Sequence, residues 1–156
     1  FASILQSCLN NNQEGMDIQE SLRLAFLSAN ADLSTQPIEL KAGSTATVAL
    51  IKAGCLHIAN VGDTMAVLSR EGRALEVTER HHAWNRAEIE RLRGLGGHIT
   101  GNGLVEGEKE LTRSVGNLHL LPLIVSNPSS KSISLTVQDE FLIIATGSLW
   151  RAIPAQ

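Results

Sequence analysis

The stretch from Gly43 to Gly72 constrains the fold of this chain most. It contains three short apolar runs, at residues 45–53, 56–61 and 65–69, and tight turns that carry glycine join them. Short apolar runs rich in β-branched residues and separated by such turns are typical of antiparallel strands that follow one another directly. The sequence therefore predicts a β-meander here, and the turn at Glu71-Gly72 leads into a further strand at 74–78.

Helices are predicted on both sides of this meander. Residues 17–33 carry apolar side chains at helical spacing on one stripe, and Asp17 followed by Glu20 resembles a capping box. A second helix is predicted at 85–95 and ends at Gly96-Gly97, which permits a left-handed cap. Residues 1–9 are expected to be the end of another helix.

The last third of the chain is predicted to be mostly extended. Residues 111–115 and 118–125 are short extended candidates, and 132–137 alternates with Ile133, Leu135 and Val137 on one face. The continuous apolar run at 141–146, FLIIAT, predicts a strand that is buried on both faces. A short helix is predicted at 148–153. With helices outside antiparallel strands, the sequence favours an α+β fold in a single domain, residues 1–156.

Composition excludes some classes of function. The chain has 156 residues, 19% of them charged, a formal net charge of -3 and no run of Lys or Arg, so no nucleic-acid partner is expected. It has no apolar run of membrane-spanning length, so we expect neither a signal peptide nor a membrane partner. Cys8 and Cys55 lack metal-type spacing, which favours free thiols and an intracellular location, cytoplasmic or nuclear. Because the chain begins with Phe1, we expect a fragment.

Several motifs share one order along the chain. They are G-S-T-A at 43–46, L-x-I-A-N-V-G-D-T at 56–64, E-x-x-R-L-x-x-x-G-G at 88–97, L-T-R-S-V-G at 111–116 and D-E-F-L-I-I-A at 139–145, followed by Leu149-Trp150. In this order they resemble the metal-dependent protein serine/threonine phosphatases of type 2C. The resemblance implies an α-β-β-α sandwich, in which two antiparallel sheets are flanked by helices, and it covers roughly residues 21–152.

The resemblance also locates metal positions, and most of them are not acidic here. It implies that Asp63 lies at the metal-binding edge of the sandwich. Active members have Asp where this chain has Asn117, and they follow the later strand with S-D-G-L-W-D where this chain has T-G-S-L-W-R. Gly147 therefore replaces a metal-binding Asp, and Arg151 replaces a second acid. Two further family elements, D-G-H-G-G and D-N, are expected to lie outside this chain.

These replacements are chemically severe. Paired Mg²⁺ or Mn²⁺ ions require anionic oxygen ligands, whereas an amide is neutral and glycine has no side chain. A guanidinium nearby costs a bound cation several kcal/mol of repulsion, by an order-of-magnitude estimate. We therefore predict no catalytic residue and no cofactor, with Asp63 as the sole surviving ligand position and Asn117 and Gly147 as degenerate ones. If the protein is active, the cofactor is Mg or Mn.

Each site residue also has a simpler structural interpretation. Asp63 is either a remaining metal ligand or a turn residue that caps nearby backbone N–H groups. Arg113 either holds an anion or forms a structural salt bridge. His81 and His82 are adjacent, so their side chains point apart, and they are expected to lie in a solvated loop rather than to form a metal pair.

Three functions are compatible with these residues. The first is a pseudophosphatase that binds a protein partner or a phosphoprotein without hydrolysing it. The alternative is an active metal-dependent phosphatase that hydrolyses phosphoserine and phosphothreonine, and the third is a structural module of a longer protein. We also expect the FLIIAT strand to be an exposed sheet edge and an interaction face.

Overall fold

The computed structural model describes residues 2–10, 17–36 and 41–156. Its elements follow in the order α1 (Ala2–Asn10), α2 (Ile18–Ser34), β1 (Gly43–Ser44), β2 (Ala46–Lys52), β3 (Cys55–Val61), β4 (Met65–Arg70), β5 (Arg73–Glu76), α3 (Arg86–Gly94), β6 (Val115–Gly116), the 3-10 helix η1 (Leu118–Leu120), β7 (Ser129–Ser134), β8 (Asp139–Ala145) and α4 (Gly147–Ala152). None of the described helices is long and apolar enough to span a membrane.

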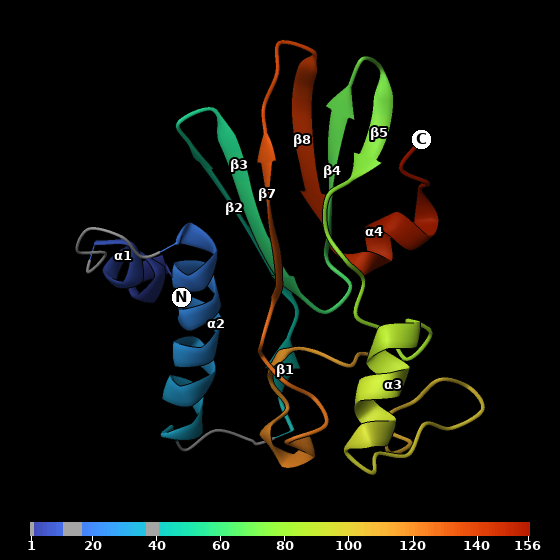
Figure 1. Cartoon of the computed structure of the whole chain (residues 1–156). Coiled ribbons are helices and arrows are strands. Elements are labelled where there is room, and N and C mark those ends of the chain that lie inside the picture. Colours follow the sequence, from blue (N-terminus) through green and yellow to red (C-terminus); the bar gives the residue numbers. More distant parts are fainter. Residues whose placement is uncertain (1, 11–16, 37–40) are drawn as a thin grey trace.

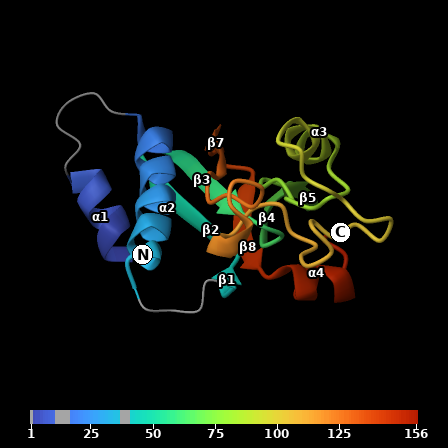
Figure 2. The same ribbon diagram turned by 90° about the horizontal axis from the view of Figure 1, so that it is seen from below.

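Two antiparallel sheets of three strands face each other. One has the strand order β2-β3-β7 and the other β5-β4-β8. Figure 2 shows the two sheets from below, with α2 outside the first and α4 beside the second. The predicted α+β fold, a sandwich of antiparallel sheets with helices outside, is confirmed.

The meander forms because apolar side chains alternate toward the space between the sheets. Ile58 on β3 and Leu68 on β4 are almost fully buried there, and Leu142 of β8 packs against the same cluster. Two tight turns connect the strands, and at both of them glycine adopts a positive φ, Gly54 at 70° and Gly62 at 88°. Such a conformation strains most other residues, so these glycines fix where β3 begins and ends.

Helix α2 covers the outer face of the first sheet (Figure 1). Its Leu22 and Phe26 are fully buried against Ala59 and Val61 of β3. Asp17 caps the helix, because its side chain accepts a hydrogen bond from the backbone N–H of Gln19. The other half of the predicted capping box does not form, since Glu20 pairs with Arg23 instead.

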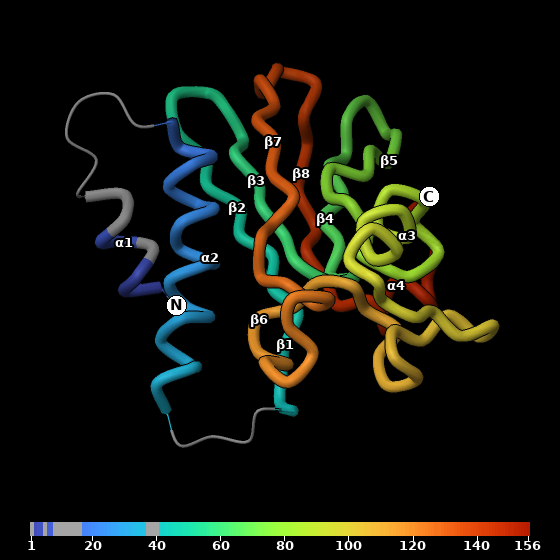
Figure 3. The backbone as a smooth tube through the Cα atoms, turned by 60° about the horizontal axis from the view of Figure 1, so that its bottom comes forward, coloured from blue at the N-terminus to red at the C-terminus, as the bar shows by residue number. Residues whose placement is uncertain are grey.

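A second, smaller core lies below the sandwich. Helix α3 buries Leu92 against Val105, Leu120 and Ile124 of the long connection between α3 and β7. Figure 3 shows how this connection returns to the sandwich, where β6 lies beside β1 although the two are far apart in the sequence. Gly96 ends α3 with a φ of 76°, as its position in the sequence predicts.

Three predictions about the last third of the chain are wrong in part. The run 141–146 is not buried on both faces, because β8 is an edge strand and Phe141 and Ile143 are 58% and 44% exposed. It is the edge that we also expected. Residues 111–125 form the two-residue strand β6 and the 3-10 helix η1 rather than two extended segments. Val137 is 98% exposed, because it lies in the turn after β7. The sequence also predicts a polar loop at 10–15, and this stretch lies largely outside the described residues.

Candidate functional site

Asp63 lies in the turn between β3 and β4, at the lower end of the sandwich. The preceding Gly62 needs its positive φ, and there is no room for a side chain, because a β-carbon built there would lie 2.3 Å from Cγ2 of Thr45. The side chain of Asp63 is 13% exposed. The turn therefore holds a carboxylate in a nearly enclosed position.

Helix α4 meets this carboxylate. The Nη1 group of Arg151 lies 3.3 Å from Oδ2 of Asp63 and donates a hydrogen bond to it, while Nη2 donates to Oγ of Ser148. The Arg151 side chain is 59% exposed. The structure thus brings together Asp63, Gly147 and Arg151, the three positions at which the resemblance implies acidic side chains.

Gly147 completes this arrangement by having no side chain. A β-carbon built on Gly147 would lie 1.8 Å from Oδ2 and 2.3 Å from Cγ of Asp63. The carboxylate of Asp63 therefore occupies the space that a side chain at position 147 would need. The set of donors here is one carboxylate that is already paired with a cation, so the residues present do not fit a divalent metal pair.

Asn117 lies elsewhere in the site region, against β1. Its backbone φ is 51°, its Nδ2 donates to Oγ of Ser114 over 2.8 Å, and its backbone N–H donates to the carbonyl of Ala42. Its Oδ1 is buried and has no hydrogen-bond partner among the described residues. A β-carbon at Gly43 would lie 2.2 Å from Nδ2, so the amide fills the space beside that glycine. The contacts of Asn117 are therefore with the paired strands β1 and β6 and the residues next to them.

Arg113 forms a salt bridge with Glu88, as the structural interpretation of this residue predicts. Its Nη2 lies 2.5 Å from Oε1 of Glu88, and its Nη1 donates to the backbone carbonyl of Asn127. Glu88 is 2% exposed and also accepts from Arg91 and Thr112. Burial alone raises the pKa of this carboxyl, but the hydrogen bonds from Arg113, Arg91 and Thr112 outweigh it and lower the pKa to about 2. The Arg113 guanidinium is therefore committed to structural contacts.

The interpretation of His81 as part of a solvated loop is wrong. His81 is fully buried and is joined by hydrogen bonds to Gly62 and Ser129. Burial, followed by the nearby charge of Arg113, lowers the pKa of His81 to about 4. A histidine in a polar stretch gives no periodic signal. Its separation of 19 residues from Gly62, across the β4–β5 hairpin, is the feature that could have suggested the contact.

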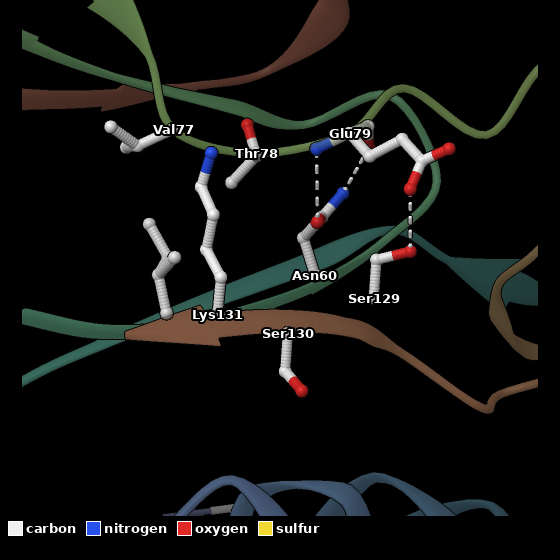
Figure 4. Close-up of a pocket in the computed structure, with 8 residues that line it drawn as sticks. Asn60, Val77, Thr78, Glu79, Ser129, Ser130 and Lys131 are labelled. Carbon is white, nitrogen blue, oxygen red and sulfur yellow. Dashed lines mark hydrogen bonds between the residues drawn. The ribbon is translucent and has the colours of Figure 1, made fainter. Parts of the chain in front are cut away.

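Figure 4 shows residues that line a cavity of the sandwich. The volume of this cavity is about 150 Å³, and one of its lining residues, Ser129, is hydrogen-bonded to His81. Asn60, Glu79, Ser129 and Lys131 contribute polar groups to its wall. A larger groove of about 380 Å³ lies on the outer face of the second sheet, between Phe141, Ile143 and Trp150. In the part of the chain that the structure describes, no group of three or more His, Cys, Asp or Glu side chains could hold a metal ion.

Comparison with known proteins gives matches over nearly the whole chain. The family model described as "Protein phosphatase 2C" matches residues 2–156. An adenylate cyclase of Mycosarcoma maydis is 38% identical over 117 residues, which are 74% of this chain and 5% of that protein. "Probable protein phosphatase 2C 32" of Oryza sativa subsp. japonica is 30% identical over 154 residues, which are 97% of this chain and 39% of that protein.

Among solved structures, a sex determining protein of C. elegans superimposes with a TM-score of 0.90. The match covers 97% of this chain and 39% of that chain at 19% sequence identity, so it demonstrates a common fold only. The chain thus spans well under half the length of each of these three proteins.

Proposed function

Because the chain belongs to the protein phosphatase 2C family, we propose that it is a non-catalytic member, a pseudophosphatase that binds a protein partner or a phosphoprotein without hydrolysing it. The observation that carries this proposal is the pairing of Asp63 with Arg151 beside Gly147. Catalysis in this family needs divalent ions, and the cationic guanidinium lies where such an ion would need carboxylate ligands.

The charge at this end of the sandwich favours binding over hydrolysis. One guanidinium nitrogen of Arg151 contacts Asp63, yet the Arg151 side chain is 59% exposed, and its guanidinium keeps donors for a further acceptor. Arginine donors in a planar fork suit phosphate and carboxylate groups. A phosphorylated or acidic segment of a partner is therefore the ligand class that we propose.

The context that we propose is a longer protein. The adenylate cyclase of Mycosarcoma maydis contains a matching region that is only 5% of its length, which supports a phosphatase-like domain inside a multidomain chain. The free thiol of Cys55 agrees with a reducing compartment, so we propose an intracellular location, cytoplasmic or nuclear.

The alternative function is an active phosphatase that takes metal ligands from segments outside these residues. One experiment separates it from the proposal. Phosphoserine and phosphothreonine peptides are mixed with the full-length protein, with and without an excess of Mn²⁺, and bound peptide and released phosphate are measured in the same samples.

The proposal predicts saturable peptide binding and no more phosphate release than the Asp63→Asn variant gives. An Arg151→Met variant should bind the peptides more weakly. Metal-dependent release that Asp63→Asn abolishes would overturn the proposal and establish the alternative. Absence of any peptide binding would contradict the phosphorylated ligand class.

A further inference from the structure

His81 forms two hydrogen bonds with Gly62, the residue that immediately precedes Asp63. The backbone N–H of His81 donates to the carbonyl oxygen of Gly62 over 3.0 Å, and the backbone N–H of Gly62 donates to Nδ1 of the His81 ring over 3.1 Å. Both polar groups of the Gly62 backbone are therefore bonded to one buried residue. The turn that presents Asp63 has little freedom to move while these two bonds persist.

The bond from Gly62 determines where the proton of the ring lies. Nδ1 accepts a hydrogen bond, so in the neutral ring it has no proton, and the proton must be on Nε2. Nε2 then donates to Oγ of Ser129 over 2.8 Å, and the Ser129 hydroxyl donates to Oε2 of Glu79 over 3.0 Å. Every donor in this chain of bonds thus has one acceptor.

The same chain of bonds ties the two sheets together. Ser129 begins β7 of the first sheet, while Glu79 and His81 follow β5 of the second. Asn60 of β3 reinforces the tie, because its Nδ2 donates to the carbonyl of Glu79 and its Oδ1 accepts from the Glu79 N–H, as Figure 4 shows. A displacement between the sheets at this end would therefore pull on the Asp63 turn.

The surroundings keep the ring neutral. The charged groups near it are Arg113, Glu88 and Glu79. Burial and the positive charge of Arg113 oppose a second proton more strongly than the two carboxylates favour it, and the pKa lies at about 4. A doubly protonated ring could not accept from Gly62, so the bond to the turn is preserved at neutral pH.

From this geometry we propose that His81 is a positioning residue for the Asp63–Arg151 pair: its Nε2–H tautomer holds Gly62, and through Gly62 it holds the Asp63 carboxylate within reach of Arg151. The proposal rests on the proposed function, since it names how the binding end of the sandwich is kept in shape. The pair is a single contact of 3.3 Å, so a shift of about 1 Å in the turn takes it beyond the range of a direct hydrogen bond.

Two substitutions of His81 separate the roles of its two ring nitrogens, because each variant keeps the hydrogen bond of only one of them. In His81→Asn the amide oxygen can take the place of Nδ1 and accept from Gly62, but the side chain is too short to reach Ser129. In His81→Gln the longer amide can donate to Ser129 and leaves Gly62 without its acceptor. The two variants are matched in polarity, and they differ in which of the two bonds they keep.

The readout is the NMR signal of the Arg151 guanidinium, and its response to Asp63→Asn, in each background. We expect a response in the unmodified chain and in His81→Asn of the same size within twofold, and loss of most of the response in His81→Gln. A response in His81→Gln equal to that of the unmodified chain would overturn the proposal, as would its loss in both variants to the same degree.

A second measurement keeps the proposal falsifiable if His81→Gln does not fold. Ring ¹⁵N shifts of His81 in the unmodified chain at pH 7 should report the Nε2–H tautomer, and an Nδ1–H tautomer would contradict the proposal. Neither measurement contains metal or phosphopeptide. Failure of the positioning role is therefore distinguishable from failure of the proposed function, which shows as metal-dependent phosphate release.

Discussion

Two arginine–carboxylate contacts in this molecule use the same chemistry in different surroundings. Glu88 is 2% exposed and lies between Arg91 and Arg113, which are 24% and 16% exposed, and a threonine hydroxyl and backbone carbonyls complete the network. Asp63 meets one nitrogen of Arg151, which is 59% exposed. The first contact joins α3 to the long connection between α3 and β7. The second joins α4 to the turn between β3 and β4, at the lower end of the sandwich.

Burial decides what each contact contributes. Removing one partner from a buried network leaves uncompensated charge in a poorly solvated place, which is costly. A pair whose arginine is largely exposed, as Arg151 is, is screened by water on that side and contributes less to stability. We therefore interpret the Glu88 network as a structural clamp and the Asp63–Arg151 pair as a feature of the binding end, and substitutions at the two contacts test this division.

The largest expected effect is that of Glu88→Gln. It removes the charge that two guanidinium groups share, so the free energy of unfolding should fall by about 3–5 kcal/mol. Chemical denaturation followed by circular dichroism measures the loss. The matched control is Glu90→Gln on the same helix, whose partner Arg86 is 92% exposed, and it should cost at most about 0.5 kcal/mol. Equal losses in the two variants would contradict the clamp.

The next effect is a pH dependence of stability that His81 causes. Its pKa is lowered from 6.5 to about 4 in the folded chain. Between these two pH values the unfolded chain therefore binds a proton at His81 that the folded chain does not bind. The contribution of His81 to the free energy of unfolding is fully present above pH 6.5 and is lost as the pH falls toward 4. At about 1.4 kcal/mol for each pKa unit, this loss is at most about 3.5 kcal/mol.

Urea denaturation at several pH values between 7 and 4.5 tests this prediction, with His81→Asn as the comparison. The variant should show a flatter dependence between pH 6.5 and 4.5. Glu88 acts in the same direction but over a lower range, because its pKa of about 2 lies below the ordinary value of 4.5. Parallel curves for the variant and the unmodified chain would show that His81 is not the cause.

The smallest expected effect on stability is that of Arg151→Met. The Arg151 side of the contact is 59% exposed, so water screens the pair, and the free energy of unfolding should change by less than about 1 kcal/mol and should depend on salt. Arg113→Met is the comparison, and it should cost several times more, because it leaves Glu88 with one guanidinium fewer. If Arg151→Met is as destabilising as Arg113→Met, the two contacts do not differ as we describe.

Much of the fold could be predicted from the sequence because its signals are local. The glycine turns at Gly54 and Gly62, the apolar stripe of α2 and the Asp17 cap are short-range patterns, and they gave the strands and helices with small errors at their ends. The failures lie where tertiary contacts decide. Residues 141–146 form a continuous apolar run, and such a run is found in edge strands and in central strands alike. The sequence alone therefore could not tell an edge strand from a buried one.

The site was predictable only to the level of residue types. The resemblance points to Asp63, Gly147 and Arg151 one by one, but not to the guanidinium bonded to the carboxylate or to the carboxylate filling the space beside Gly147. The role of His81 depends on a contact across the β4–β5 hairpin and on burial. Neither property has a periodic signal in the sequence.

The most direct test of the central claim is a calorimetric titration of the chain with Mn²⁺, alongside a variant that carries Gly147→Asp and Arg151→Asp together. We predict no saturable heat in the micromolar range for the unmodified chain, because the Asp63 carboxylate is paired with Arg151. The double variant removes the competing cation and supplies two carboxylates, so it should bind at least one ion once Asp63 moves aside. Tight binding of two ions by the unmodified chain, lost in Asp63→Asn, would contradict the claim that this end of the sandwich holds no metal pair.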